Sequence, residues 1–256
     1  MTMPETMAEA LNLQGHGLLA IVGAGGKTTA MFQLARQLPG LVWITTTTHL
    51  GTDQLDEVDQ HFILCEPAEI DLPLLKSRRT TLITGMFTPD YRVRGPEADV
   101  MKELLTIADK KSISFIVEAD GSRSHPIKAP GEIEPVIPDW ARMVVVVAGL
   151  TALDKPFKSE WVHRSERFKV LTGVHPGEPI TMNLLTKLLV HPQGGLKGIP
   201  ANAERVVLLN QTDTPELREQ AADAVGELLA GGYDRVVIGA LQKAPEDLAV
   251  FARVKR

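Results

Sequence analysis

The residues best suited to chemistry stand near the N-terminus, in a glycine-rich stretch that ends in lysine and two threonines. Phosphate oxygens are bound by several backbone N–H groups converging on one point, which requires residues with little or no side chain. Lys27 would place an ammonium group on the outer phosphates of a nucleotide, and the Thr28 hydroxyl would coordinate an accompanying Mg²⁺ ion. The predicted phosphate loop comprises Gly23, Ala24, Gly25, Gly26, Lys27, Thr28 and Thr29.

This loop departs from the full P-loop pattern at one position. Gly-x-x-x-x-Gly-Lys-Ser/Thr requires a glycine where the chain has Ile21. Gly23 still stands four residues before Lys27, and the shortened turn resembles the loops of the Mur-type ATP-dependent ligases. The alternative is an ordinary glycine-rich turn between a strand and a helix. Because the strand, glycines, lysine, threonines and helix occur together in the required order, the pattern favours a phosphate site.

Two carboxylates follow a second apolar segment, Ile113 to Val117. A magnesium nucleotide needs a carboxylate at the end of such a strand, where it can hold the metal directly or through water. Glu118 and Asp120 lie two residues apart, so in an extended strand they point the same way. Both are predicted to hold Mg²⁺ together with Thr28, and to act with Lys27 in catalysis. A solvated pair of acids at a strand end is the alternative.

A base-recognition site is predicted near position 210. Asn210-Gln-Thr-Asp213 follows an apolar strand and is similar to the Asn-Lys-x-Asp motif of GTPases, with Gln211 in place of lysine. Asp213 could accept hydrogen bonds from N1–H and the 2-amino group of guanine, and the Asn210 amide could bond the base edge and tie loops together. These residues favour GTP over ATP as the ligand. Asn and Asp are also common in ordinary turns.

Other polar residues leave alternatives open. One of the threonines in Thr45 to Thr48 could reach the metal, but a β-branched run is equally typical of a strand end. Five basic residues follow predicted strand ends and could contact phosphates or an anionic second substrate, although each alone is more often a solvated surface charge. They are Arg123, Lys128, Lys155, Arg164 and Arg167.

Periodicity predicts an α/β fold. Short apolar runs typical of buried strands alternate with helical patterns, which implies a doubly wound, mostly parallel sheet of the P-loop NTPase type. Strands are expected at 18–22, 41–44, 80–84, 113–117, 143–148, 206–209 and 235–238, and helices at 28–38, 97–110, 181–190 and 215–230. The stretch 149–202 is less regular and rich in Gly and Pro. We therefore predict a single domain over 1–256 with an insert or mobile lid at about 149–202.

Composition narrows the class of protein. The 256 residues are 44% hydrophobic and carry a formal net charge of −5, with dispersed basic residues, which gives no electrostatic reason to propose nucleic acid as a partner. The N-terminus lacks a basic region followed by an apolar stretch, and no apolar run is long enough to span a bilayer. One cysteine cannot form an intrachain disulfide. We expect a soluble, cytoplasmic protein without a membrane partner; a homodimer stays open.

With the phosphate loop, Val117-Glu-Ala-Asp-Gly-Ser-Arg-Ser-His-Pro-Ile-Lys-Ala-Pro130, Val162-His-Arg164 and Asn210-Gln-Thr-Asp213 in that order, the chain resembles the YqeC family over nearly its full length. The Glu-Ala-Asp-Gly-Ser stretch is the most specific element. The resemblance implies an accessory factor in the maturation of selenium-dependent molybdenum hydroxylases. Its implied partners are such a hydroxylase or its cofactor-loading protein.

Three functions are compatible with these residues. The first is an NTPase, with GTP favoured, whose hydrolysis resets a lid that engages a partner. The second is an ATP-dependent kinase or ligase acting on a small-molecule or cofactor substrate, which the shortened loop and nearby basic residues favour. The third is a nucleotide-sensing scaffold that binds without turnover.

Overall fold

The computed structural model describes residues 4–13, 15 and 17–253. Its centre is a nine-stranded sheet in which every neighbouring pair is parallel except β12 with β13 at one edge. In spatial order the strands are β13 (Ala244–Ala252), β12 (Arg235–Ala240), β11 (Glu204–Asn210), β9 (Met143–Gly149), β1 (Leu18–Gly23), β7 (Ser114–Glu118), β2 (Val42–Thr46), β5 (Thr80–Thr84) and β4 (Gln60–Ile63). The predicted doubly wound, mostly parallel α/β fold is confirmed.

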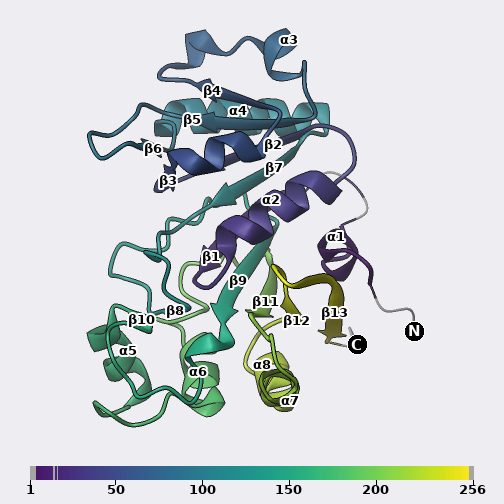
Figure 1. Cartoon of the computed structure of the whole chain (residues 1–256). Helices are drawn as coiled ribbons and strands as arrows, with labels where there is room; N and C mark the ends of the chain where they lie inside the picture. Colours follow the sequence, from purple (N-terminus) through teal and green to yellow (C-terminus); the bar gives the residue numbers. More distant parts are fainter. Residues whose placement is uncertain (1–3, 14, 16, 254–256) are drawn as a thin grey trace.

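Helices cover both faces of this sheet (Figure 1). They are α1 (Met7–Ala10), α2 (Lys27–Gln37), α3 (Leu72–Leu75), α4 (Ala98–Lys111), α5 (Ser165–Thr172), α6 (Met182–Leu189), α7 (Pro215–Asp223) and α8 (Val225–Ala230). Short 3₁₀ turns span Thr52–Glu57, Pro67–Glu69 and Leu150–Ala152. Two small pairs lie outside the sheet: β8 (Ile127–Lys128) with β10 (Val162–His163), and β3 (His49–Gly51) with β6 (Arg92–Arg94).

Alternation along the buried strands produces the two faces. In β1, Leu19 and Ile21 pack in the apolar cluster that contains α1 and α2, whereas Ala20 and Val22 pack in the cluster on the other face. Successive side chains of a strand point to opposite faces, so a continuous apolar run supplies both layers. The apolar run that predicted β1 is therefore explained by burial on two sides.

The segment 149–202 is joined to this core. Phe157, Phe168, Leu185 and Leu188 are buried in the same cluster as β9 and β11. Figure 1 shows α5 and α6 gathered with β8 and β10 beyond the end of β9, at the bottom of the view. The single domain with a mobile insert stays a prediction, and a lid motion of the whole segment would have to expose these side chains.

Two sequence expectations need adjustment. The helix predicted at 215–230 is divided at Ala224 into α7 and α8. Strands β4 and β13, at the two sheet edges, were not predicted. Over the part of the chain that the structure describes, no helix has the length and apolarity that a membrane crossing requires.

Candidate functional site

The glycine loop connects β1 to α2, and all three of its glycines have a positive φ and no room for a Cβ, as Gly23 and Gly26 illustrate. Gly23 and Gly26 have φ of +96° and +123°, a region that disfavours residues with a Cβ. A Cβ on Gly23 would lie 2.2 Å from the Val147 carbonyl oxygen, and one on Gly26 would lie 2.2 Å from Asn210 Nδ2. The loop is therefore packed between β9 and the end of β11.

The donors that remain for an anion are not those expected. The N–H groups of Gly23, Ala24 and Gly25 already donate, to the Asp120 carboxylate, the Val147 carbonyl at 2.8 Å and the His125 carbonyl at 3.1 Å. The first-turn N–H groups of a helix have no partner within it, which leaves those of residues 27–29 at the start of α2. The predicted phosphate donors thus shift from the start of the loop to the positive end of the helix.

Lys27 lies buried at the centre of this arrangement, with its side chain 3% exposed. Its Nζ donates to the Gly23 carbonyl at 3.0 Å and to Ser122 Oγ at 3.1 Å. The same nitrogen lies 3.6 Å from Glu118 Oε1 and 3.5 Å from Asp120 Oδ1. The ammonium group therefore offsets two buried carboxylates; its contact with phosphate stays a prediction.

Glu118 ends β7 and is held by the phosphate loop. Thr28 Oγ1 donates to Glu118 Oε2 at 2.8 Å, which joins two of the three residues predicted to hold Mg²⁺. Burial raises the pKa of Glu118, and the opposing effects of Lys27 and the Thr28 hydrogen bond do not cancel it. Both Thr28 and Glu118 line a large groove, as do Gly25, Gly26 and Thr29.

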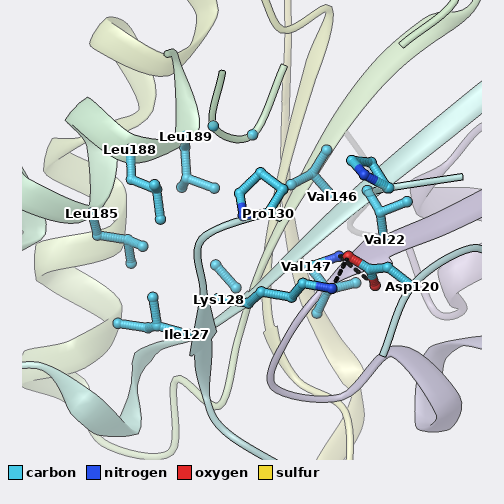
Figure 2. A pocket seen from close by; sticks show the side chains of 15 residues that line it. Val22, Asp120, Ile127, Lys128, Pro130, Val146, Val147, Leu185, Leu188 and Leu189 are labelled. Atoms are coloured by element: carbon cyan, nitrogen blue, oxygen red, sulfur yellow. Dashed lines mark hydrogen bonds and ion pairs between the residues drawn. The ribbon is translucent and has the colours of Figure 1, made fainter. Parts of the chain in front are cut away.

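Asp120 lies behind the loop and not on the groove. Its two carboxylate oxygens each accept from Gly23 N at 3.1 Å, and Oδ2 is 3.0 Å from Lys128 Nζ. Figure 2 shows this pair beside a small apolar cavity of about 30 Å³ lined by residues such as Leu185 and Leu188. The structure therefore does not bring Asp120 to the metal side of the loop. Its contacts make it an anchor of the strand-to-loop turn.

A chain of alternating charges continues from Asp120 to the segment beyond β9. Lys128 Nζ bonds the Gly121 carbonyl at 2.6 Å and lies 2.6 Å from Glu134 Oε2. Arg164 then clasps Glu134 with two hydrogen bonds of 2.6 and 2.8 Å. Burial would raise the pKa of Glu134, but the hydrogen bonds from Arg164 and Lys128 outweigh it and lower this pKa from 4.5 to about 2. The sequence had suggested a solvated Lys128; it is fully buried.

The lowered pKa of Glu134 predicts a pH-dependent contribution to stability. A carboxyl group whose pKa is depressed by folding stabilises the protein above its unfolded pKa, and this contribution is lost as pH falls through the folded pKa. We expect Glu134→Gln to lower the free energy of unfolding at pH 7, with the difference from wild type shrinking between pH 4.5 and about 2. Denaturant unfolding over this range measures it. Glu132→Gln, exposed and two residues away, is the control; a Glu134→Gln deficit constant down to pH 2.5 would contradict the assignment.

The predicted base-recognition residues, Asn210 and Asp213, line the same groove and make different contacts. Asn210 Nδ2 donates to the Gly25 carbonyl at 2.8 Å, and Oδ1 accepts from Leu241 N at 3.0 Å, so this buried amide ties the phosphate loop to the turn after β12. Asp213 lines the groove, 3.6 Å from Lys243. Asn210 is therefore engaged within the protein, and contact between Asp213 and a base stays a prediction. The Leu241 to Lys243 turn also lines the groove and was missed, because no sequence pattern marks it.

The four threonines from Thr45 to Thr48 make different contacts. Thr45 Oγ1 donates to the Ile83 carbonyl at 2.7 Å and Thr46 Oγ1 to the Glu118 carbonyl at 3.0 Å, so both serve the sheet. Thr47 and Thr48 line the groove. The Thr47 hydroxyl is buried without a partner among the described residues, which makes it the threonine with a free polar atom beside the site.

Nothing else in the described ranges offers a metal cage, since no group of three or more His, Cys, Asp or Glu side chains is placed to hold an ion. Mg²⁺ is commonly bound through one or two carboxylates together with substrate phosphates. The Thr28–Glu118 pair fits that mode, because it supplies one hydroxyl and one carboxylate beside the N-terminus of α2, where phosphate binding is predicted.

Comparisons with known proteins bear on this arrangement. The family model described as YqeC protein matches residues 19–166, which include the phosphate loop, Glu118, Asp120 and Arg164. The chain belongs to the YqeC family. A relative from Escherichia coli (strain K12), described as uncharacterized protein YqeC, is 32% identical to this chain over 243 residues, covering 89% of each chain.

One solved structure is similar at the level of the backbone. The structure of chloroplast FtsY from Physcomitrella patens matches 98% of this YqeC protein and 66% of its own length, with a TM-score of 0.44 and 14% identity. The chain thus spans just under two thirds of that protein. At this distance the likeness carries no argument about what the YqeC protein binds.

Proposed function

We propose that this protein binds a nucleoside triphosphate with Mg²⁺ in the groove and hydrolyses it, with GTP preferred over ATP. The observation that supports this most is the placement of Lys27, the Thr28–Glu118 pair and Asp213 along one groove of about 1470 Å³. The volume exceeds the roughly 300–1,000 Å³ of typical ligand pockets, so a nucleotide fits with room beyond it.

Binding would proceed by exchange of contacts that already exist. The Lys27 ammonium group now satisfies the Gly23 carbonyl and Ser122 Oγ, and the outer phosphates of the nucleotide would take over these hydrogen bonds. The free N–H groups at the start of α2 would hold the inner phosphates. Asp213 would accept from the guanine edge, while Asn210 keeps the phosphate loop and the base loop in register.

Chemistry would follow from charge neutralisation at the phosphate end. A Mg²⁺ ion held at Thr28 and Glu118 would offset the charge that spreads over the transferred phosphoryl group. Lys27 would share that charge from the opposite side. Glu118, whose pKa burial raises, and the unpartnered Thr47 hydroxyl are the groups placed to orient a water molecule.

Two substitutions distinguish the role of Glu118, on the metal side of the loop, from that of Asp120, which anchors the loop. We expect Glu118→Gln to lower Mg²⁺-dependent affinity or turnover about 10–100-fold, because a group that orients the metal is lost. Asp120→Asn should instead lower the free energy of unfolding by about 1.5–3 kcal/mol, since the buried Lys128 ammonium group loses one of its two carboxylate partners and keeps only Glu134. Binding with and without Mg²⁺ should then weaken alike.

These expectations are checked by nucleotide titrations with and without Mg²⁺ and by denaturant unfolding of both variants. The sequence alone assigned both carboxylates to the metal, so the comparison is decisive between two assignments. A Mg²⁺-specific defect in Asp120→Asn, with normal stability, would return Asp120 to the metal site.

The family resemblance supplies a biological setting for this proposal. Hydrolysis would serve the maturation of a selenium-dependent molybdenum hydroxylase, acting on the hydroxylase or on its cofactor-loading protein. Phosphate release by the purified protein, measured over many turnovers with and without such a partner, tests this role. Binding without any turnover would favour the nucleotide-sensing scaffold.

Group transfer is the second candidate, and one observation favours it. The groove does not end at Lys27 but continues along Ser122, Arg123 and His125 to His163. A hydrolase needs only water at that position, whereas a kinase or ligase needs space for an acceptor. Product analysis with candidate acceptors distinguishes the two.

A further inference from the structure

A second hollow, of about 510 Å³, opens beside α5 next to the phosphate end of the groove. The two spaces share a wall, because His125, His163 and Arg164 line both. The groove side of this wall leads to Ser122, whose Oγ accepts the hydrogen bond from Lys27. A molecule in the hollow could therefore extend to the phosphate-binding lysine.

Two guanidinium groups flank the shared wall without partners. Arg167 lines the hollow, and its Nε is buried with no hydrogen-bond partner. Arg123 lines the groove on the other side and is exposed. Within the described residues, neither guanidinium makes a hydrogen bond or an ion pair. The buried Nε has almost no accessible surface, so the other N–H groups of the Arg167 guanidinium, which also make no hydrogen bond among the described residues, are the donors available to an acceptor in the hollow.

The surroundings are electropositive although the whole chain carries a net charge of −5. Burial, then Arg164 and Lys128, lower the pKa of His163 to about 4, so this imidazole is neutral at pH 7. Burial and then Arg167 likewise lower the pKa of Lys197, whose opposing partners are glutamates. Glu134 neutralises Arg164, which leaves Arg123 and Arg167 as the unpaired positive charges, with Glu166 as the acidic side chain that lines the hollow.

We propose that the hollow beside α5 binds the phosphate or carboxylate group of a small anionic second ligand, with Arg167 as its principal partner and Arg123 at its groove side. Ser159 and Ser165 also line the space and supply polar groups for such a ligand, while Glu166 is the acidic side chain at its edge. Anion binding in the hollow does not depend on the proposed function. Only one part of the proposal rests on that function, namely that the ligand would approach the outer phosphate of a bound nucleotide.

The test titrates the full chain with inorganic phosphate and, separately, with malonate, at constant ionic strength, by calorimetry. Wild type and Lys27→Ala are compared, because the latter weakens the phosphate loop as a competing anion site. Arg167→Gln should raise the dissociation constant of the bound anion about tenfold or more, as expected for loss of a charged hydrogen bond. Arg78→Gln, an exposed arginine in the turn before β5, removes the same charge and should leave the constant within about twofold.

The two probes show whether the hollow binds a phosphate group, a carboxylate group or both, since phosphate and malonate are titrated separately. If Arg167→Gln does not fold, the anion dissociation constant of Arg123→Gln, an exposed position, is compared with that of Arg78→Gln instead. Loss of all anion binding in Lys27→Ala, or equal constants in the arginine variants and the control, would overturn the second site. Nucleotide titration of wild type keeps the two proposals apart: absence of nucleotide binding refutes the proposed function while anion binding at Arg167 stands.

Discussion

Replacement of Lys27 by alanine should lower the affinity for a magnesium nucleoside triphosphate by about a hundredfold to ten-thousandfold. The ammonium group is placed to contact two phosphates, and each hydrogen bond between charged groups contributes about 1.5–3 kcal/mol. Calorimetric titration of wild type and variant with the same triphosphate and Mg²⁺ measures the effect.

The same substitution should also cost stability, which the sequence did not indicate. Lys27 Nζ lies 3.6 Å from Glu118 Oε1 and 3.5 Å from Asp120 Oδ1, and its removal leaves two buried carboxylates facing each other. Lys27→Met keeps an aliphatic side chain of similar length, so comparison with Lys27→Ala separates the loss of the charge from the loss of packing. A folded Lys27→Met protein with wild-type affinity would refute the phosphate assignment.

The second large effect concerns the base. In Asp213→Asn, guanine donors face an amide that cannot accept from both, whereas xanthine carries a carbonyl at position 2 to which the amide can donate. Each exchanged hydrogen bond to a charged group is worth about 1.5–3 kcal/mol, so the ratio of GTP to xanthosine triphosphate affinity should fall about tenfold or more. Competition binding with the two triphosphates measures this ratio directly.

Asn210→Ala is the matched control for this switch. Its amide joins the Gly25 carbonyl to Leu241 N, so its loss should weaken both triphosphates to a similar extent and leave their ratio unchanged. A wild-type preference for ATP, or an Asp213→Asn ratio equal to that of wild type, would show that residues 210–213 form an ordinary turn.

Local sequence patterns predicted the central strands and helix α2, because burial on both faces of the sheet requires continuous apolar runs and a helix packed on the sheet requires a helical apolar stripe. The apolar run before Gly23 and the helical stripe after Lys27 identify β1 and α2 within one residue of their observed bounds. The buried central strands were found for the same reason. The edge strand β13 was missed because its mixed burial produces neither a continuous apolar run nor a clean alternation.

The site was predicted less completely, and Asp120 shows why. The two-residue periodicity that placed Glu118 and Asp120 on one side holds only within a strand, and β7 ends at Glu118. Asp120 therefore lies in a loop, where its direction is decided by Gly23 N and Lys128. Such partners lie far apart in sequence, so neither the buried state of Lys128 nor its ion pair with Glu134 could be inferred from spacing.

The central claim is that the groove takes a nucleoside triphosphate with Mg²⁺, and a thermal-shift titration of the wild-type chain tests it most directly. GTP, ATP and their diphosphates are each added with and without Mg²⁺. A ligand at a hundred times its dissociation constant stabilises the folded state by about 2.7 kcal/mol. We expect a Mg²⁺-dependent rise in melting temperature that is largest for GTP and absent in Lys27→Met. A wild-type melting temperature unchanged by every triphosphate at millimolar concentration would contradict it.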